Sequence, residues 1–413
     1  MQRQKQIMEL TFHQLDNGIR LVHHTIPGMV AYCGLIINTG SCNETEAEHG
    51  IAHLIEHMLF KGTRKRKAYY VLSRLDDVGG ELNAYTTKEE TAIYASFICN
   101  DYERAVEIIS DIAFNSVFPE KEIEKEKDVI IEEINSYLDN PAELIFDDFE
   151  EMIFAGQPIG RSILGTPQTV KGFKKEDLSR FISKNYFTDQ MVFCSVGNIP
   201  VNKMMNLFRK HFADKAPMIS GARPETSGRY SPVSITKEKN TYQNHCITGN
   251  IAYNLKDERR IRLFMLNNIL GGQGLNSRLN LSLREKNGLA YNVESSYNPY
   301  FETGLFSVYF GTDSRNMDKS FSIVMSELKR LRTTKLGIVQ LSKARNQIKG
   351  YLARGYENHE SLMLSLGKSL QVFGKIDTPE ETYRKIDEIS SSDLLETANE
   401  IFETSLLSTL IYK

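Results

Sequence analysis

Two histidines and a glutamate stand close together near the N-terminus of this 413-residue chain. The segment from His53 to His57 contains no Pro or Gly and has apolar neighbours, which predicts a helix. Residues four apart lie on one face of a helix, so His53 and His57 can reach the same metal ion, with Glu56 beside that face. Two imidazoles suit Zn²⁺, and a nearby carboxylate can accept a proton from a water that the metal holds. This order inverts the His-Glu-x-x-His zinc-peptidase motif.

A pattern of this length also arises by chance, and a single buried histidine is usually a core residue whose ring is hydrogen-bonded. Three titratable groups on one side of a mostly apolar helix fit that explanation poorly, because each needs a partner once it is buried. The composition of the segment therefore favours the metal site.

Catalytic zinc usually has three protein ligands and one open position. The remaining histidines have no supporting spacing, and the five cysteines include no Cys-x-x-Cys pair. The predicted helix 119–138 carries Glu126, Glu132 and Glu133, of which the first and last are two turns apart. Spacing alone leaves all three open as the third ligand.

Length and composition set the broad class. A chain of 413 residues with 41% hydrophobic content suggests two domains with sizeable cores. The net charge is −3 without a long basic run, which argues against a nucleic-acid partner. We see neither a secretory signal nor an apolar run of about 18 residues, so no membrane segment is expected. An odd number of scattered cysteines is typical of free thiols, and a cytoplasmic location is expected.

Hydrophobic periodicity predicts an α+β fold. Alternating residues over 18–40, around Pro27-Gly28, predict a hairpin. The histidine helix is expected near 47–61, and a second helix near 68–78 ends at Gly79-Gly80. Further strands are predicted at 82–87, 91–99 and 190–197, and further helices at 101–115, 119–138, 141–154, 176–186 and from the last strand to about 212.

The second half of the chain repeats features of the first. Glu90-Thr91-Ala-Ile-Tyr-Ala is similar to Glu302-Thr303-Gly-Leu-Phe-Ser, at an offset of 212 residues. Residues 213–231 are rich in Gly, Pro and Ser, as linkers are. We therefore predict two homologous α/β units in tandem. Their predicted bounds are 1–213 for the metal-binding unit, 214–231 for the linker and 232–413 for a second unit whose counterpart of the histidine helix, near 265–269, has no ligands.

Longer motifs give a resemblance over nearly the whole chain. They are Leu15-Asp-Asn-Gly18, Gly40-Ser41, the stretch from Gly50 to Thr63, Gly79-Gly80-x-x-Asn83-Ala84 and Glu132-Glu133-Ile134. With these motifs the chain resembles the pitrilysin/insulinase-type zinc peptidases, and most of all the short branch with bacterial processing-type peptidases and the mitochondrial processing peptidase β subunit. Leu54 stands where relatives often have Phe, which is an apolar replacement.

The resemblance implies one zinc ion per chain, bound by His53, His57 and Glu133. It implies that Glu56 takes the proton of the attacking water and passes it to the leaving amine. It also implies that Glu126 orients a ligand histidine from behind.

The resemblance further implies residues that hold the substrate. Arg284 and Tyr291, which follow the run Gly271-Gly272-Gln-Gly274, are implied to contact the peptide opposite the zinc. Without the resemblance they would be interpreted as a surface charge and a strand-core residue. Asn83 and Ala84 are implied to form a strand edge to which the peptide adds, with Phe60 also contacting it.

These features predict a zinc-dependent endopeptidase that cleaves unfolded peptides in a closed chamber. The tandem units are expected to form half of a clamshell, and a homodimer is expected to place Arg284 and Tyr291 of one copy opposite the zinc of the other. The alternative is a non-catalytic assembly or recognition subunit, which is disfavoured because the chain keeps every ligand. A structural zinc site would need a fourth ligand, usually Cys, and none is suitably spaced.

Overall fold

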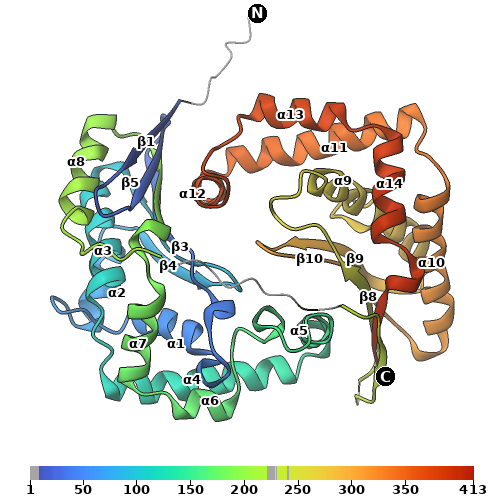
Figure 1. The fold of residues 1–413 in the computed structure, drawn as a ribbon, viewed down its shortest axis with the longest axis horizontal. Coiled ribbons are helices and arrows are strands. Elements are labelled where there is room, and N and C mark those ends of the chain that lie inside the picture. The colour runs from blue at the N-terminus through green and yellow to red at the C-terminus, as the bar shows by residue number, and fades with distance from the viewer. Residues whose placement is uncertain (1–8, 221–227, 229, 240) are drawn as a thin grey trace, which may run out of the picture. The chain divides into compact units, whose positions relative to one another are not determined.

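The computed structural model describes residues 9–220, 228, 230–239 and 241–413, which form two compact units. Each unit is a mixed β-sheet with helices on both faces, as the sequence predicts (Figure 1). Unit 1 consists of residues 1–134, 162–223 and 354–378, and unit 2 of residues 135–161, 224–353 and 379–413.

Six strands form the sheet of unit 1 in the order β1-β2-β6-β3-β5-β4. Their bounds are β1 Leu10–Gln14, β2 Arg20–Thr25, β3 Val30–Ile37, β4 Glu81–Thr86, β5 Thr91–Ile98 and β6 Met191–Gly197. β2 and β6 are parallel, and the other neighbouring pairs are antiparallel. Within the described part of the chain β4 pairs only with β5, so β4 is an edge strand with open backbone groups.

The hairpin predicted for residues 18–40 is wrong. Both of its strands exist, as β2 and β3, but β6 lies between them and pairs with each. The alternation of side chains identifies a strand without identifying its partner, and the fully buried β6 comes from a distant part of the chain. The first strand, β1, was not predicted.

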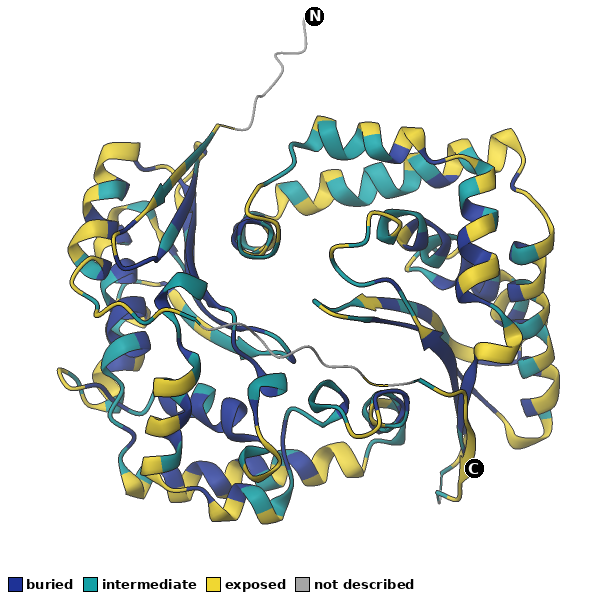
Figure 2. Cartoon of the chain, viewed as in Figure 1, coloured by how far each residue is buried: buried dark blue, intermediate teal, exposed yellow. Residues whose placement is uncertain are grey.

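The central strand β6 is buried on both faces of the sheet (Figure 2). Met191 and Phe193 join the core on one face, and Val192 and Cys194 join a separate cluster on the other, as strand alternation requires. On the first face lie α1 Ile51–Leu59, α2 Ala68–Asp76, α3 Tyr102–Asn115 and α8 Val201–Phe212, and on the second lies α12 His359–Phe373.

Unit 2 repeats this sheet with one strand fewer, in the order β7-β11-β8-β10-β9. Its strands are β7 Ser234–Lys237, β8 Asn244–Ile251, β9 Ala290–Pro299, β10 Gly304–Thr312 and β11 Ser408–Tyr412. The parallel pair β7–β11 matches β2–β6, and the remaining antiparallel pairs match in the same order, which confirms the predicted duplication. α9 Arg260–Gly271 follows β8 as α1 follows β3, and it contains no His, Cys, Asp or Glu.

The two units do not follow the contiguous bounds predicted at 1–213 and 232–413. α5 Pro141–Ile153 belongs to unit 2, where Ile145 and Phe149 pack with Ile247 and Leu410. α12 comes from the second half of the sequence and covers the sheet of unit 1. An amphipathic pattern shows that a helix is buried on one side but not which sheet covers it.

The remaining helices complete the layers. They are α4 Glu120–Leu138, α6 Pro167–Gly172, α7 Lys175–Asn185, α10 Met317–Thr333, α11 Ile338–Glu357, α13 Pro379–Glu388 and α14 Ser391–Ile401. No helix in the described ranges is long and apolar enough to cross a membrane. In the predicted linker, residues 214–220 form no helix or strand, and Met218 hydrogen-bonds to Thr188 of unit 1, while 221–227 and 229 lie outside the described residues.

Candidate metal centre

The histidine helix α1 begins at a sharply defined point. Gly50 precedes it with a φ of +94°, which favours glycine, and its Cα packs against Gly165 so closely that a Cβ would lie 2.8 Å from the Gly165 Cα. The buried carboxylate of Glu44 accepts hydrogen bonds from the Gly50 and Ala52 amides, each at 2.9 Å. These contacts satisfy amides that a helix N-terminus leaves unpaired.

The apolar residues of α1 determine which face carries the chemistry. Five fully buried side chains form the stripe that packs into unit 1: Ile51, Leu54, Ile55, Met58 and Leu59. Their spacing is that of a helix with one core-facing side. His53, Glu56 and His57 consequently share the remaining side, as the sequence predicts.

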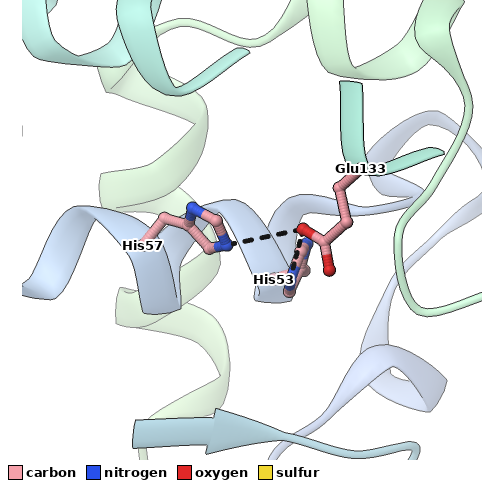
Figure 3. Close-up of side chains that lie close together, drawn as sticks. All are labelled: His53, His57 and Glu133. Atoms are coloured by element: carbon pink, nitrogen blue, oxygen red, sulfur yellow. Dashed lines mark ion pairs between the residues drawn. The ribbon is translucent and has the colours of Figure 1, made fainter. Parts of the chain in front are cut away.

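α4 brings Glu133 to the two histidines (Figure 3). Its Oε2 atom lies 3.7 Å from Nε2 of His53 and 3.8 Å from Nε2 of His57. One donor atom from each of the three residues lies within 4.8 Å of the other two. Of the three glutamates that the sequence leaves open, Glu132 is exposed and Glu126 contacts the far side of His57. Glu133 is therefore the one placed to share a metal with both rings.

Glu126 is buried behind His57 and contacts two groups. Its Oε2 lies 3.0 Å from Nδ1 of His57, and its Oε1 lies 2.6 Å from Nζ of Lys61. The sequence analysis did not point to Lys61, which lies just beyond the last residue of α1, Leu59. A carboxylate on Nδ1 fixes the ring orientation and leaves Nε2 for a metal.

Burial shifts the pKa values of His53 and Glu56. Burial and the neighbouring His57 ring lower the pKa of His53 to about 3, so its imidazole is neutral at neutral pH and able to bind a metal. Burial also raises the pKa of Glu56, although interactions with Thr86 and His57 offset part of the rise. A carboxylate with a raised pKa is a better proton acceptor near neutral pH.

The predicted substrate residues of unit 1 lie around α1. Asn83 and Ala84 are on the edge strand β4, which packs beside α1; Asn83 is exposed and Ala84 half-buried. Phe60 caps the C-terminus of α1 and packs partly against the core. Their positions allow the predicted roles, which stay predictions.

Arg284 and Tyr291 lie together in unit 2. Arg284 belongs to the π-helical segment Asn280–Glu285, and Tyr291 is the second residue of β9. The guanidinium carbon is 5.1 Å from the centre of the tyrosine ring. Tyr291 is 76% exposed, so the alternative that it is a core residue is wrong. Its role in binding substrate stays a prediction.

Comparisons with known proteins identify the family of the chain. Residues 21–167 match the family model "Insulinase (Peptidase family M16)", and residues 172–348 match "Peptidase M16 inactive domain". An uncharacterized zinc protease of Rickettsia bellii is 33% identical over 400 residues, 96% of either chain. The uncharacterized zinc protease YmxG of Bacillus subtilis is 30% identical over 399 residues, again 96% of either chain.

Solved structures share the fold. A protease from Helicobacter pylori superposes with a TM-score of 0.89 at 20% identity, covering 98% of this chain and 99% of that one. A Pseudomonas fluorescens structure described as a peptidase M16 inactive domain gives 0.91 at 16% identity, covering 98% of both chains. The full-length matches at 30% identity and above, together with the two family models, show that the chain belongs to the insulinase (M16) peptidase family.

Proposed function

We propose that this protein is a zinc-dependent endopeptidase. The observation that carries the proposal is the convergence of His53, His57 and Glu133 beside Glu56. The names of the family relatives, which are zinc proteases, support it.

The donor set fits zinc. Two imidazoles and one carboxylate match the three-ligand pattern of catalytic zinc sites, which leaves one position open. Nδ1 of His53 is buried with no hydrogen-bond partner among the described residues, so the polar contact of that ring is through Nε2, toward Glu133. His53, His57 and Glu133 would therefore hold one zinc ion per chain. When bound, zinc supplies a Lewis acid that makes a water more acidic and polarises the scissile carbonyl.

Glu56 would move the proton. It lies one residue before His57 on the same side of α1, and burial raises the pKa of its carboxyl. It would accept a proton from the attacking water and deliver it to the nitrogen of the leaving amine. The water oxygen would form the new bond to the carbonyl carbon as the C–N bond breaks. One water proton would reach the amine nitrogen through Glu56, and the other would remain on the new carboxyl group until it ionises.

The substrate would bind as an extended strand. Among the described residues the outer edge of β4, beside α1, pairs with no other strand, and main-chain hydrogen bonds there would bind a peptide with little sequence demand. Such binding favours unfolded peptides, because their backbone groups are free to pair, whereas most backbone groups of a folded domain are already hydrogen-bonded.

A homodimer is part of the proposal. Arg284 and Tyr291 of one copy would contact the peptide held by the other, around a chamber that both copies enclose. The exposure of Tyr291 and its contact with Arg284 in unit 2 support this role. A cytoplasmic location is also proposed, and it is supported by the five cysteines, none of which forms a disulfide.

Zinc analysis combined with a cleavage assay tests the function. The purified protein and a His57→Ala variant are analysed for bound zinc and incubated with an unstructured peptide. We expect zinc and cleavage in the wild type and neither in the variant. A protein that binds zinc but cleaves no unstructured peptide would be the non-catalytic subunit instead.

A further inference from the structure

Glu44 is a buried acidic residue that no motif explains. It lies between β3 and α1, and the residue is 3% exposed. One oxygen accepts the Gly50 amide and the other the Ala52 amide, both at 2.9 Å. A carboxylate with two charge-assisted bonds is strongly held, so it fixes the first turn of the helix that carries His53.

The segment that carries Glu44 is itself fixed to the turn after the edge strand β4. The Ser41 amide donates to the Thr87 carbonyl at 3.1 Å, and the Cys42 amide to the Lys88 carbonyl at 2.8 Å. A Cβ on Gly40 would lie 2.3 Å from the Thr87 oxygen, so only glycine allows this approach. The segment therefore joins the start of α1 to the turn between β4 and β5.

The negative charge of Glu44 bears on metal binding as well as its hydrogen bonds do. A helix N-terminus carries roughly half a positive charge, which disfavours a cation nearby. His53 is the third residue of the nine-residue helix α1, so a divalent cation held by His53 would be bound from the first turn of the helix. The negative charge of the Glu44 carboxylate would offset this positive charge at the N-terminus of α1, the end of the helix that carries His53.

We infer that Glu44 is a positioning residue of the metal site, which both sets the first turn of α1 and neutralises its positive end beside the bound cation. The inference rests on the proposed zinc site at His53, His57 and Glu133. A helix cap without this role would change the stability of the protein and leave its zinc affinity unchanged.

Glu48 provides a matched control. It lies four residues after Glu44 in the same segment, and its carboxylate caps a short turn by accepting from the backbone amide and hydroxyl of Thr45 at 3.1 and 2.9 Å. Glu48→Gln removes the same charge without touching α1. Glu44→Asp keeps the charge, but its carboxylate is one methylene too short to reach both amides.

The test is a zinc titration in competition with a chromophoric chelator, on variants whose folding is checked by circular dichroism. We expect the zinc Kd to rise about 2- to 30-fold in Glu44→Gln, the range of helix-end charge effects, and less in Glu44→Asp. Glu48→Gln should stay within about twofold of the wild type, because its carboxylate is bonded to Thr45 rather than to an amide of α1.

An unchanged Kd in either folded Glu44 variant would overturn the inference, as would an equal loss in Glu48→Gln. If Glu44→Gln does not fold, Glu44→Asp decides alone. If the wild type itself binds no zinc, or His57→Ala binds it equally well, the proposed function fails rather than this inference.

Discussion

The Nδ1 atom of His57 lies 3.0 Å from Oε2 of the buried Glu126. With Nδ1 donating to that carboxylate, the other ring nitrogen, Nε2, carries the free lone pair, and it faces Glu133 at 3.8 Å. Two glutamates seven residues apart on α4 thus contact opposite sides of one imidazole. In the proposed site Glu126 would orient the ring, and Glu133 would complete the set of metal ligands.

This division of roles predicts a ranking of zinc affinities. Glu133→Gln should lose most of the bound zinc, because it removes a ligand. Glu126→Gln should weaken binding about 10- to 100-fold, as changes behind a ligand do. Equilibrium dialysis of both variants against buffered zinc measures the order. A weaker metal site in Glu126→Gln than in Glu133→Gln would exchange the two roles.

Replacement of Gly50 and of Gly79 by alanine should lower the free energy of unfolding by different amounts. Both have positive φ, +94° and +72°, so alanine is strained at either position by about 1–2 kcal/mol. At Gly50 the new Cβ would also lie 2.8 Å from Gly165 and from the Leu164 carbonyl, whereas at Gly79 it would meet nothing within 4 Å. Gly50→Ala should therefore lower the free energy of unfolding by about 3 kcal/mol or more.

Urea unfolding of the metal-free proteins compares the two glycine variants. Gly79→Ala controls for backbone strain alone. Equal losses in the two variants would mean that the contact between Gly50 and Gly165 does not constrain α1.

His23 predicts a dependence of stability on pH. Its ring is buried between β2 and β6, within 3.2 Å of the Ser195 hydroxyl and 3.0 Å of the Thr25 hydroxyl, and burial lowers its pKa to about 4. In the unfolded chain the pKa is about 6.5, so between these values the unfolded state binds more protons. The contribution of His23 to the free energy of unfolding is fully present above about pH 6.5. It falls as the pH drops toward 4, by about 3 kcal/mol in total.

Urea midpoints at about pH 5 and pH 7.5, with chelator present, measure this loss across the window in which His23 titrates. His23→Gln should show a smaller difference between the two pH values than the wild type. His24→Gln changes the next residue, whose ring contacts the Glu9 carbonyl at the surface, and should behave like the wild type. If the urea midpoints of His23→Gln differ between the two pH values as much as those of the wild type, the pH dependence comes from other groups.

Mixing two inactive variants tests the shared site. His57→Ala lacks a metal ligand, and Tyr291→Phe lacks the hydroxyl proposed to contact substrate. A mixed dimer would keep one intact combination of zinc and Tyr291 out of two. Random exchange in an equal mixture makes about half of the dimers mixed, so activity should return to about a quarter of the wild-type value if each site works alone. Sedimentation checks that dimers form. A fully active monomer, or mixed dimers without activity, would rule out the shared site.

The sequence predicted most helices and strands of unit 1. It also predicted that His53, Glu56 and His57 lie on one side of α1. Apolar residues at helical spacing around His53 and His57 are a local signal, and the structure follows it. Strand neighbours and the exchange of α5 and α12 depend on long-range packing, which a periodic pattern does not contain. The hairpin at 18–40 and the contiguous unit bounds were wrong for that reason.

The surroundings of the candidate site were less predictable than its donors. Spacing left three glutamates open, and only the packing of α4 against α1 separates Glu133 from Glu126 and Glu132. Glu44 accepts hydrogen bonds from backbone amides at the start of α1, whose first residue, Ile51, comes seven positions later, and no side-chain pattern marks such a contact. Lys61 stands four residues after His57, but α1 ends at Leu59, so helical spacing does not place it beside Glu126.

The central claim is that this chain hydrolyses peptides with Glu56 as the base and a zinc ion on His53, His57 and Glu133. The most direct measurement is the turnover of an unstructured peptide by Glu56→Gln and by the wild type, with zinc per chain determined on the same samples. We predict one zinc per chain in both and turnover at least ~10²-fold slower in the variant, because only the base is lost. Equal turnover in a fully zinc-loaded Glu56→Gln, or wild-type cleavage without bound zinc, would contradict the account.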